Sequence, residues 1–122
     1  MIDFKNGSFL KLRKSDGAAD AVTQLLIPGE HIIGSYKSIR DSVTFTNKRV
    51  IAVNVQGMTG KKKDYTSLPY SKIQAFSVET AGVLDLDSEL ELWFSGLGIV
   101  KFEFTGASDI VGIGQAIGEF IL

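Results

Sequence analysis

The chain has no cysteine, only two prolines and a single histidine among its 122 residues. Without cysteine there are no disulfide bonds, no thiolate nucleophile and no sulfur-ligated metal. His31 alone cannot build a histidine-based metal cluster. A Gly-x-Ser-x-Gly segment, which marks the serine nucleophile of many hydrolases, is also missing. These absences argue against an enzyme, and we expect neither a metal nor a cofactor.

An excess of charge of one sign and a long apolar run are missing as well. Thirteen Lys and Arg residues against fourteen Asp and Glu residues give a formal net charge of −1, so no overall field attracts nucleic acid or an anionic bilayer. The longest apolar-rich segment, 110–122, is shorter than the roughly 20 residues of a membrane-spanning helix. The first residues lack the basic and apolar regions of a signal peptide. We expect a cytoplasmic protein, with a peripheral position at the inner face of the membrane as the alternative.

What remains is the composition of one globular domain, 44% hydrophobic and 22% charged. Ser15 and Asp16 are placed to cap a first helix, which Pro28 and Gly29 end. The pattern predicts four parts: an N-terminal arm at 1–14, a helix at 15–27, a β-barrel at 31–105 and a closing helix at 108–121.

Short strand-like segments alternate with turn residues from His31 onward. The connections are too short for the helical crossovers that parallel strands require, so the sheets should be antiparallel. Asn47-Lys48 suits a two-residue hairpin, because Asn tolerates a positive φ. Pro69 cannot donate a ladder hydrogen bond and suits an edge or a bend between sheets. The expected strands are 31–39, 42–46, 49–56, 62–68, 73–80, 87–95 and 99–105.

The last two strands show the clearest alternation. Between residues 84 and 92 leucines alternate with acidic residues, which predicts a strand with one apolar and one acidic face. Residues 95–98 then reverse the chain into a second alternating strand. Two registers keep the apolar faces together. We favour the one in which Glu91 faces Lys101, because the other places Glu91 opposite Glu103.

Ser108 and Asp109 are placed to cap a closing helix that is apolar around most of its circumference. Its glycines, Gly112, Gly114 and Gly118, each lower helix stability by about 1 kcal/mol relative to alanine. We therefore expect the helix backbone to approach the sheet or a neighbouring subunit closely. A helix that is apolar on nearly all sides also needs cover beyond one sheet, which favours self-association.

Three segments carry a family resemblance: Gly29-Glu30 before the first strand, Thr46-Asn47-Lys48-Arg49 at a hairpin and Leu68-Pro69-Tyr70-Ser71-Lys72-Ile73 at a corner. Together with the order of short strands followed by one apolar helix, they make the chain resemble the bacterial PH-domain family over about residues 20–122. The resemblance implies a mainly β, pleckstrin-homology-like fold, which is a partly open antiparallel barrel with an N-terminal helix and a C-terminal capping helix. It also implies binding rather than catalysis, and several family members are thought to form ring-shaped homo-oligomers.

The longest basic run, Lys61-Lys62-Lys63, follows a loop that contains glycine. We favour a solvated hairpin tip that protects a sheet edge, since edge lysines discourage pairing with other chains. The alternative is a contact for an anionic surface or a partner, in which Lys37 and Arg40 would join the three lysines. PH domains that bind phosphoinositides typically carry a second arginine two residues on, which this chain lacks, and Asp41 adds a negative charge beside Arg40. We expect no specific phosphoinositide recognition and only weak, salt-sensitive attraction to membranes.

The acidic segment 85–91 does not match a calcium loop of the EF-hand type, because Leu90 and Gly96 stand where that loop requires glycine and glutamate. A solvated outer strand face is the favoured interpretation, and an oligomer contact with the basic N-terminal arm is the alternative. The candidate oligomer-interface residues are Lys11, Arg13, Asp85, Asp87, Glu89, Glu91, Phe120 and Leu122.

The sequence therefore predicts a non-enzymatic interaction module that assembles into a homo-oligomer and binds a protein partner. A peripheral membrane adaptor is the first alternative. A small-ligand carrier or enzyme with an open barrel mouth is the second, and for it we expect no ligand-induced rise in melting temperature. Nucleic-acid binding is not expected, because Phe102 and Phe104 share a face with Val100 and look like core residues.

Overall fold

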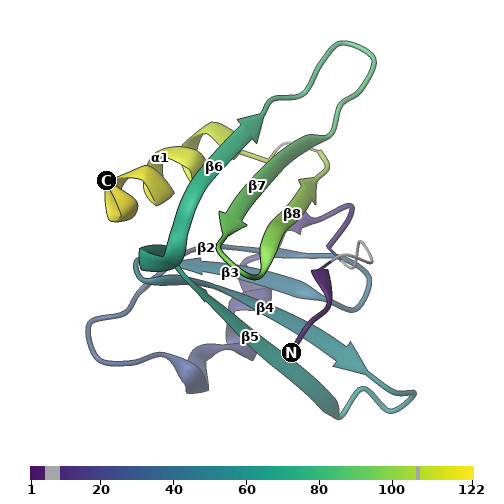
Figure 1. Cartoon of the computed structure of the whole chain (residues 1–122). Helices are drawn as coiled ribbons and strands as arrows, with labels where there is room; N and C mark the ends of the chain where they lie inside the picture. Colours follow the sequence, from purple (N-terminus) through teal and green to yellow (C-terminus); the bar gives the residue numbers. More distant parts are fainter. Residues whose placement is uncertain (5–8, 107) are drawn as a thin grey trace.

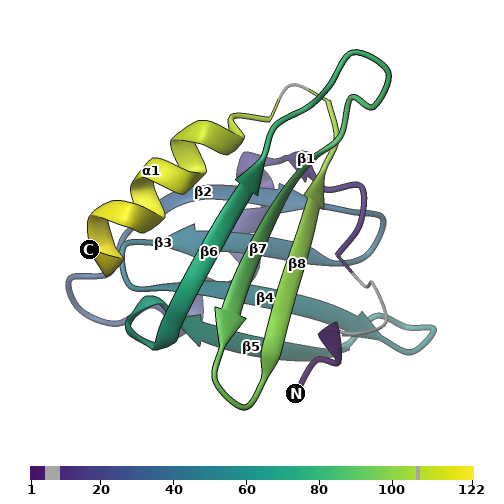
Figure 2. The ribbon, with the colours of Figure 1, turned by 45° about the horizontal axis from the view of Figure 1, so that its top comes forward.

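The structure, a computed structural model, describes residues 1–4, 9–106 and 108–122. Two antiparallel sheets pack against each other, and the strands of the second lie across those of the first (Figure 1, Figure 2). The first sheet has the order β1-β2-β3-β4-β5 and the second the order β6-β7-β8. The elements are β1 (Arg13–Lys14), β2 (Ile32–Lys37), β3 (Ser42–Thr46), β4 (Arg49–Gln56), β5 (Lys62–Pro69), β6 (Ile73–Glu79), β7 (Ser88–Phe94), β8 (Gly98–Phe104) and the helix α1 (Ile110–Ile121).

This architecture confirms the mainly β, PH-like fold that the sequence predicts. Strands β2 to β8 begin and end within two residues of the expected ranges, whereas the short strand β1 was not expected. The two ladders remain separate sheets. Helix α1 lies beside β6 at the open side of the barrel, so the barrel is partly open and capped (Figure 2).

The segment expected as one helix at 15–27 forms two short 3-10 helices, η2 (Asp16–Ala21) and η3 (Thr23–Leu25). The expected cap at Ser15 is wrong, because its side chain makes no cap hydrogen bond. The backbone of Ser15 is bound to β2 instead: Ser15 N donates to Ser35 O at 3.0 Å, and Ser15 O accepts from Ser35 Oγ at 2.6 Å. This attachment holds Ser15 in an extended conformation.

Aromatic rings form the centre of the core. Phe45 of β3 and Phe102 and Phe104 of β8 are each 2% exposed or less. Tyr36 of β2 packs edge-on against Phe45 and Phe104, with ring centroids 5.9 and 4.9 Å apart. Edge-to-face pairs of this kind contribute about 0.5–1.5 kcal/mol each beyond the burial of their area. The aromatic residues of β8 therefore join the two sheets.

The N-terminal arm closes one side of the barrel. Leu12 N donates to Glu103 O at 2.9 Å, and Thr105 N donates to Leu12 O at 2.9 Å. Leu12 thus forms a parallel bridge to Phe104 at the edge of β8. The next residues form β1, which pairs with β2. The arm connects the edges of the two sheets in this way, while its residues 5–8 lie outside the described part of the chain.

The predicted register of the last hairpin is confirmed, because Glu91 pairs with Lys101. The same register places Glu89 opposite Glu103. Cations offset that repulsion: Lys101 Nζ lies 3.1 Å from Glu89 Oε2, and Lys11 Nζ lies 3.6 Å from Glu103 Oε1. Charge and alternation therefore favour one pairing.

The expectation that Leu84 and Leu86 extend the apolar face of this hairpin is wrong. Strand β7 begins only at Ser88, and the two leucines are 98% and 68% exposed in the loop that follows β6. Local hydrogen bonds turn the chain here: Gly82 N donates to Asp85 O at 2.7 Å, and Asp87 N donates to Asp85 Oδ1 at 3.0 Å. Such short-range bonds compete with a strand ladder.

Helix α1 begins as the sequence predicts, since Gly112 N donates to Asp109 Oδ1 at 2.9 Å. The expected close approach of the helix to the sheet is found at Gly114. A β-carbon at this position would lie 2.8 Å from Val78 Cγ2 of β6, which is too close for an unstrained contact. At Gly118 the nearest atom would be Phe76 Cζ at 3.8 Å, an ordinary contact.

Two turns position the remaining strands. Pro69 ends β5 at the corner that leads into β6, which confirms its predicted place at a bend. Asn47 and Lys48 form the expected two-residue connection between β3 and β4. Asn47 does not adopt the expected positive φ, since Lys11 is the only non-glycine residue in the described ranges with a positive φ.

No helix within the described ranges is long and apolar enough to cross a membrane.

Candidate functional site

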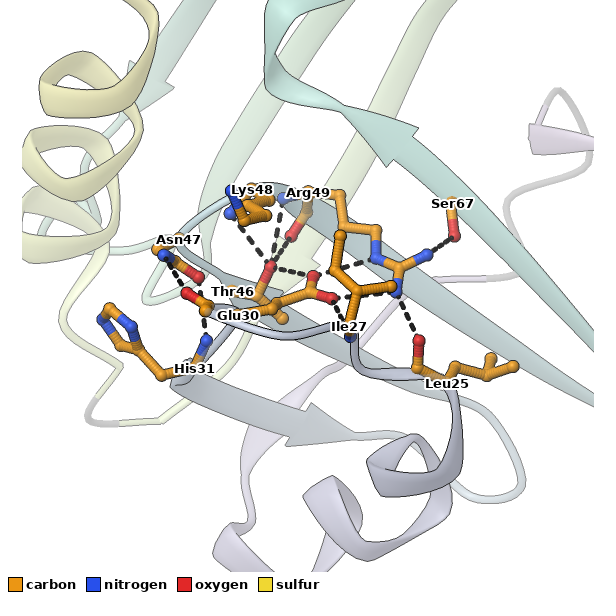
Figure 3. A network of polar contacts seen from close by, with 10 residues as sticks. Leu25, Ile27, Glu30, His31, Thr46, Asn47, Lys48, Arg49 and Ser67 are labelled. Atoms are coloured by element: carbon orange, nitrogen blue, oxygen red, sulfur yellow. Dashed lines mark hydrogen bonds and ion pairs between the residues drawn. The ribbon is translucent and has the colours of Figure 1, made fainter.

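A buried ion pair lies beneath the β3–β4 hairpin (Figure 3). The Glu30 side chain is fully buried and accepts two hydrogen bonds from one guanidinium, from Arg49 Nε and Arg49 Nη2, both at 2.9 Å. Thr46 Oγ1 donates a third bond to Glu30 Oε2 at 2.7 Å. Parallel bonds of this kind between guanidinium and carboxylate are strong and fix the geometry of both side chains.

Arg49 connects two further parts of the chain through the same guanidinium. Its Nη1 donates to Ser67 Oγ of β5 at 2.9 Å, and its Nη2 donates to Leu25 O at the end of η3 at 2.8 Å. Glu30 in turn accepts from the amide of Ile27 at 3.2 Å. One ion pair thus holds together the helical segment, the start of β2, the β3–β4 hairpin and an edge strand.

Asn47 acts through its side chain rather than through its backbone. Asn47 Oδ1 accepts from His31 N at 2.8 Å, and Asn47 Nδ2 donates to Gly29 O at 3.0 Å. Thr46 Oγ1 accepts from the amides of Lys48 and Arg49, both at 3.1 Å, and so closes the turn. The Gly29-Glu30 and Thr46-to-Arg49 segments are therefore two halves of one structural unit. The sequence marks both segments but does not show that they pair.

The electrostatics of this unit make Glu30 sensitive to acid. Burial opposes ionisation of Glu30, but the hydrogen bonds from Arg49, Thr46 and the Ile27 amide outweigh it and lower its pKa from 4.5 to about 2. The carboxylate is therefore charged at neutral pH. Both carboxylate oxygens of Glu30 accept hydrogen bonds from other residues of the chain, which indicates a role in stabilising the fold rather than in catalysis.

Stability is expected to fall as the pH is lowered from about 4.5 to about 2, because the folded state holds Glu30 ionised in this range while the unfolded state binds the proton. Above pH 4.5 this contribution is fully present. Asp64 and Asp87, whose pKa values are also lowered by hydrogen bonds, add to the same trend. Urea midpoints measured at several pH values test the expectation. Glu30→Gln should show a smaller pH dependence than the wild type, and an equal dependence would contradict the assignment.

The predicted basic contact lies at one end of the first sheet. Arg40, between β2 and β3, donates a hydrogen bond from Nη2 to Gly57 O in the β4–β5 connection. Lys61 precedes β5, and Lys62 and Lys63 begin it. Because β5 is an edge strand, the lysines stand where edge protection is needed. The structure therefore places Arg40 against the loop that leads into the lysine triplet, while Lys37 ends β2.

Several of the candidate interface residues are paired within the chain. Lys11 Nζ lies 2.6 Å from Asp87 Oδ2 in the same chain, and this hydrogen bond raises the pKa of Lys11 and lowers that of Asp87. Arg13 pairs with Lys37 across β1 and β2, so two cations face each other there. Glu89 binds Lys101, Glu91 lies opposite Lys101, and Asp85 lies in the exposed β6–β7 loop.

The end of α1 carries the remaining two candidates. Phe120 stacks on Tyr70, with ring centroids 6.2 Å apart and an interplanar angle of 11°, and is 39% exposed. Leu122 is 99% exposed. Within the described ranges, no group of three or more His, Asp or Glu side chains is placed to hold a metal ion.

Sequence comparison identifies the family to which the chain is similar. The sequence model of the bacterial PH domain matches residues 4–121. The Bacillus subtilis proteins YjqA and YozO, both described as uncharacterised, are 49% identical over 77 residues and 40% identical over 86 residues. These matches cover 63% of this chain and 62% of YjqA, and 70% of this chain and 73% of YozO. The chain thus spans about three fifths of the length of YjqA.

Solved structures agree with the sequence matches. A crystal structure of a protein with a pleckstrin-homology domain from Shewanella loihica has a TM-score of 0.79 and 40% identity, and covers 93% of this chain and 99% of that chain. A pleckstrin homology domain from Shewanella amazonensis has a TM-score of 0.64 and 41% identity over 87% of this chain and 86% of its own. None of these matches indicates an enzyme family. The chain belongs to the bacterial PH-domain family.

Proposed function

We propose that the protein is a non-catalytic interaction module that associates with copies of itself and binds a protein partner through the assembled surface. The observation that carries the proposal is the β6–β7 loop, which projects beyond the second sheet (Figure 1). Val83, Leu84 and Leu86 in this loop are 93%, 98% and 68% exposed. Exposed apolar side chains that gather on one projecting loop are typical of a protein–protein contact.

A second copy of the chain offers a complementary surface. A groove of about 460 Å³ lies where β6 begins, whereas the loop lies where β6 ends. Lys72 lines this groove, is exposed, and forms no ion pair within the described part of the chain. Asp85 lies between Leu84 and Leu86 in the loop, and its carboxylate can form an ion pair with Lys72 of another copy. The apolar lining of the groove includes Leu68, Pro69, Ile73, Phe94 and Leu97.

Such a contact joins the loop of one copy to the groove of the next. Because the two surfaces differ, the contact is head-to-tail, and repetition gives a closed ring if the rotation between copies allows closure. Apolar burial would supply most of the affinity, and the Asp85–Lys72 pair would fix the register.

Size-exclusion chromatography with light scattering tests self-association directly. We expect a discrete oligomer for the wild type and a lower mass for Leu84→Asp, because a buried unpaired carboxylate opposes the contact. Met58→Asp, at an equally exposed apolar residue of another loop, should keep the wild-type mass. Asp85→Lys should weaken the oligomer, and adding Lys72→Asp should restore it. A monomeric wild type at high concentration would overturn the proposal.

A peripheral membrane adaptor is the second candidate function, and one observation favours it. The hydrogen bond from Arg40 to the Gly57 carbonyl joins two loops. The apolar side chains at their tips, Ile39 and Met58, are almost fully exposed. The basic residues Lys37 and Lys61 to Lys63 stand beside these tips. Apolar tips within a basic rim suit contact with an anionic lipid surface.

Cosedimentation with vesicles that contain phosphatidylserine tests this candidate. We expect binding at low salt that weakens as ionic strength rises, with a contribution of about 1 kcal/mol from each basic residue near the surface. Replacing Lys61, Lys62 and Lys63 with glutamine should lower binding strongly, whereas Lys48→Gln, at the exposed β3–β4 connection, should not. Absence of binding at low salt would eliminate this function.

A further inference from the structure

A cavity of about 190 Å³ lies between helix α1 and the first sheet. Helix α1 contributes Ile113, Ala116 and Ile117 to its wall, and these residues give one side an apolar lining. The exposed residues Lys14 and Asp109 stand at its mouth. The sheet and the β5–β6 corner contribute Ile33, Gly34, Tyr36, Phe45 and Tyr70.

Two tyrosines in this wall are almost completely buried. Tyr36 is 4% exposed and Tyr70 is 2% exposed, yet neither hydroxyl has a hydrogen-bond partner among the described residues. Buried hydroxyls are normally paired, since an unpaired one loses its hydration without compensation. Within the same ranges, Thr44 Oγ1 is the only unpaired side-chain oxygen that is fully shut off from solvent. The tyrosine hydroxyls are therefore reached through the cavity.

The geometry beside Gly34 supports this placement. A methyl group added at Gly34 would lie 3.7 Å from Tyr36 Oη, so the hydroxyl lies over the backbone of β2 at the cavity wall. Burial raises the pKa of Tyr36, and the nearby Asp109 carboxylate adds to the effect. Burial also raises the pKa of Tyr70, and the Glu30 carboxylate adds to the effect. Both hydroxyls stay protonated at neutral pH and are available as donors.

We propose that this cavity binds a small aromatic carboxylate, with the ring against α1 and the acceptor oxygens toward Tyr36 and Tyr70. An apolar cavity of about 150 Å³ is known to admit benzene, so the volume fits one ring. The tyrosine hydroxyls are donors, and so is the Lys14 ammonium, which also lies 4.0 Å from Asp16 Oδ1. Asp109 already accepts from Gly112 N. These donors favour a ligand that carries acceptor oxygens. The site is independent of self-association, because its lining does not include the β6–β7 loop.

The test is a titration of the full chain with benzoate, followed by amide chemical shifts in ¹H–¹⁵N NMR spectra. We expect saturable shifts centred on Gly34, Gly112 and Ala116, which belong to the cavity wall. Tyr36→Phe and Tyr70→Phe should each weaken binding by about tenfold to a hundredfold, the value of one hydrogen bond to a charged group. Benzylamine, a cation of similar size, should bind more weakly than benzoate.

A pair of helix variants separates cavity binding from surface binding. Ala116→Leu fills the cavity and should abolish benzoate binding, whereas Gln115→Leu on the exposed neighbouring position should not change it. If Ala116→Leu does not fold, as judged by the dispersion of its spectrum, the two tyrosine variants decide the question. Shifts that do not saturate at millimolar benzoate, or unchanged affinity in both tyrosine variants, would overturn the proposal. Equal or tighter binding of benzylamine would overturn it as well.

Discussion

Replacing Arg49 with alanine is expected to lower the free energy of unfolding by about 3–5 kcal/mol, because a buried carboxylate loses its cation. The Glu30 side chain is fully buried, so water does not replace the two lost bonds without opening the structure. The same substitution also releases Ser67 of β5 and the carbonyl of Leu25. Arg49→Lys should recover little, since an ammonium group cannot make the two parallel bonds of a guanidinium.

Urea unfolding at neutral pH measures this loss through the transition midpoint. Lys48→Ala is the matched control, because Lys48 adjoins Arg49 but is exposed, and it should change stability by no more than about 0.5 kcal/mol. Adding Glu30→Gln to Arg49→Ala should restore part of the loss, since a neutral amide is less costly to bury than an unpaired carboxylate. A loss of less than about 1 kcal/mol for Arg49→Ala would show that the pair does not hold the hairpin.

Features that depend on neighbouring residues could be predicted from the sequence. Glu91 faces Lys101 because alternation and charge select the same register. Pro69 lies at a corner because it has no amide to donate, and Asp109 caps α1 because its side chain reaches the amide of Gly112. In each case the physical cause lies within a few residues or one strand pair.

Features that depend on distant contacts could not be predicted. Glu30 and Arg49 are 19 residues apart, and neither periodicity nor turn chemistry links them. The resemblance to a known family marked both segments without showing that they pair. Leu84 and Leu86 fit a strand by alternation, yet hydrogen bonds within the loop prevail over that pattern. The cavity likewise results from the placement of α1 against the first sheet, which no local signal specifies.

The N-terminal arm is the clearest case of such long-range dependence, and it carries the second large effect. Leu12→Ala is expected to lower the free energy of unfolding by about 2–5 kcal/mol, because it leaves a cavity in a closely packed core. Leu12 is fully buried and belongs to the same cluster as Phe104, although the mixed basic and apolar sequence around it shows no period. Leu10→Ala is the matched control, since Leu10 is 46% exposed two residues earlier, and about 0.5 kcal/mol or less is expected there.

Amide hydrogen exchange locates the effect as well as measuring it. The amides of Glu103 and Thr105 donate to Phe9 and Leu12 of the arm, so their protection reports whether the arm stays bound to β8. In Leu12→Ala these two amides should exchange faster than those in the β3–β4 ladder, because the packing that holds the arm is lost while the first sheet remains paired. Equal costs for Leu12→Ala and Leu10→Ala, with unchanged exchange at Thr105, would mean that the arm does not close the barrel. The expected result would instead show that a segment without a recognisable pattern joins the edges of both sheets.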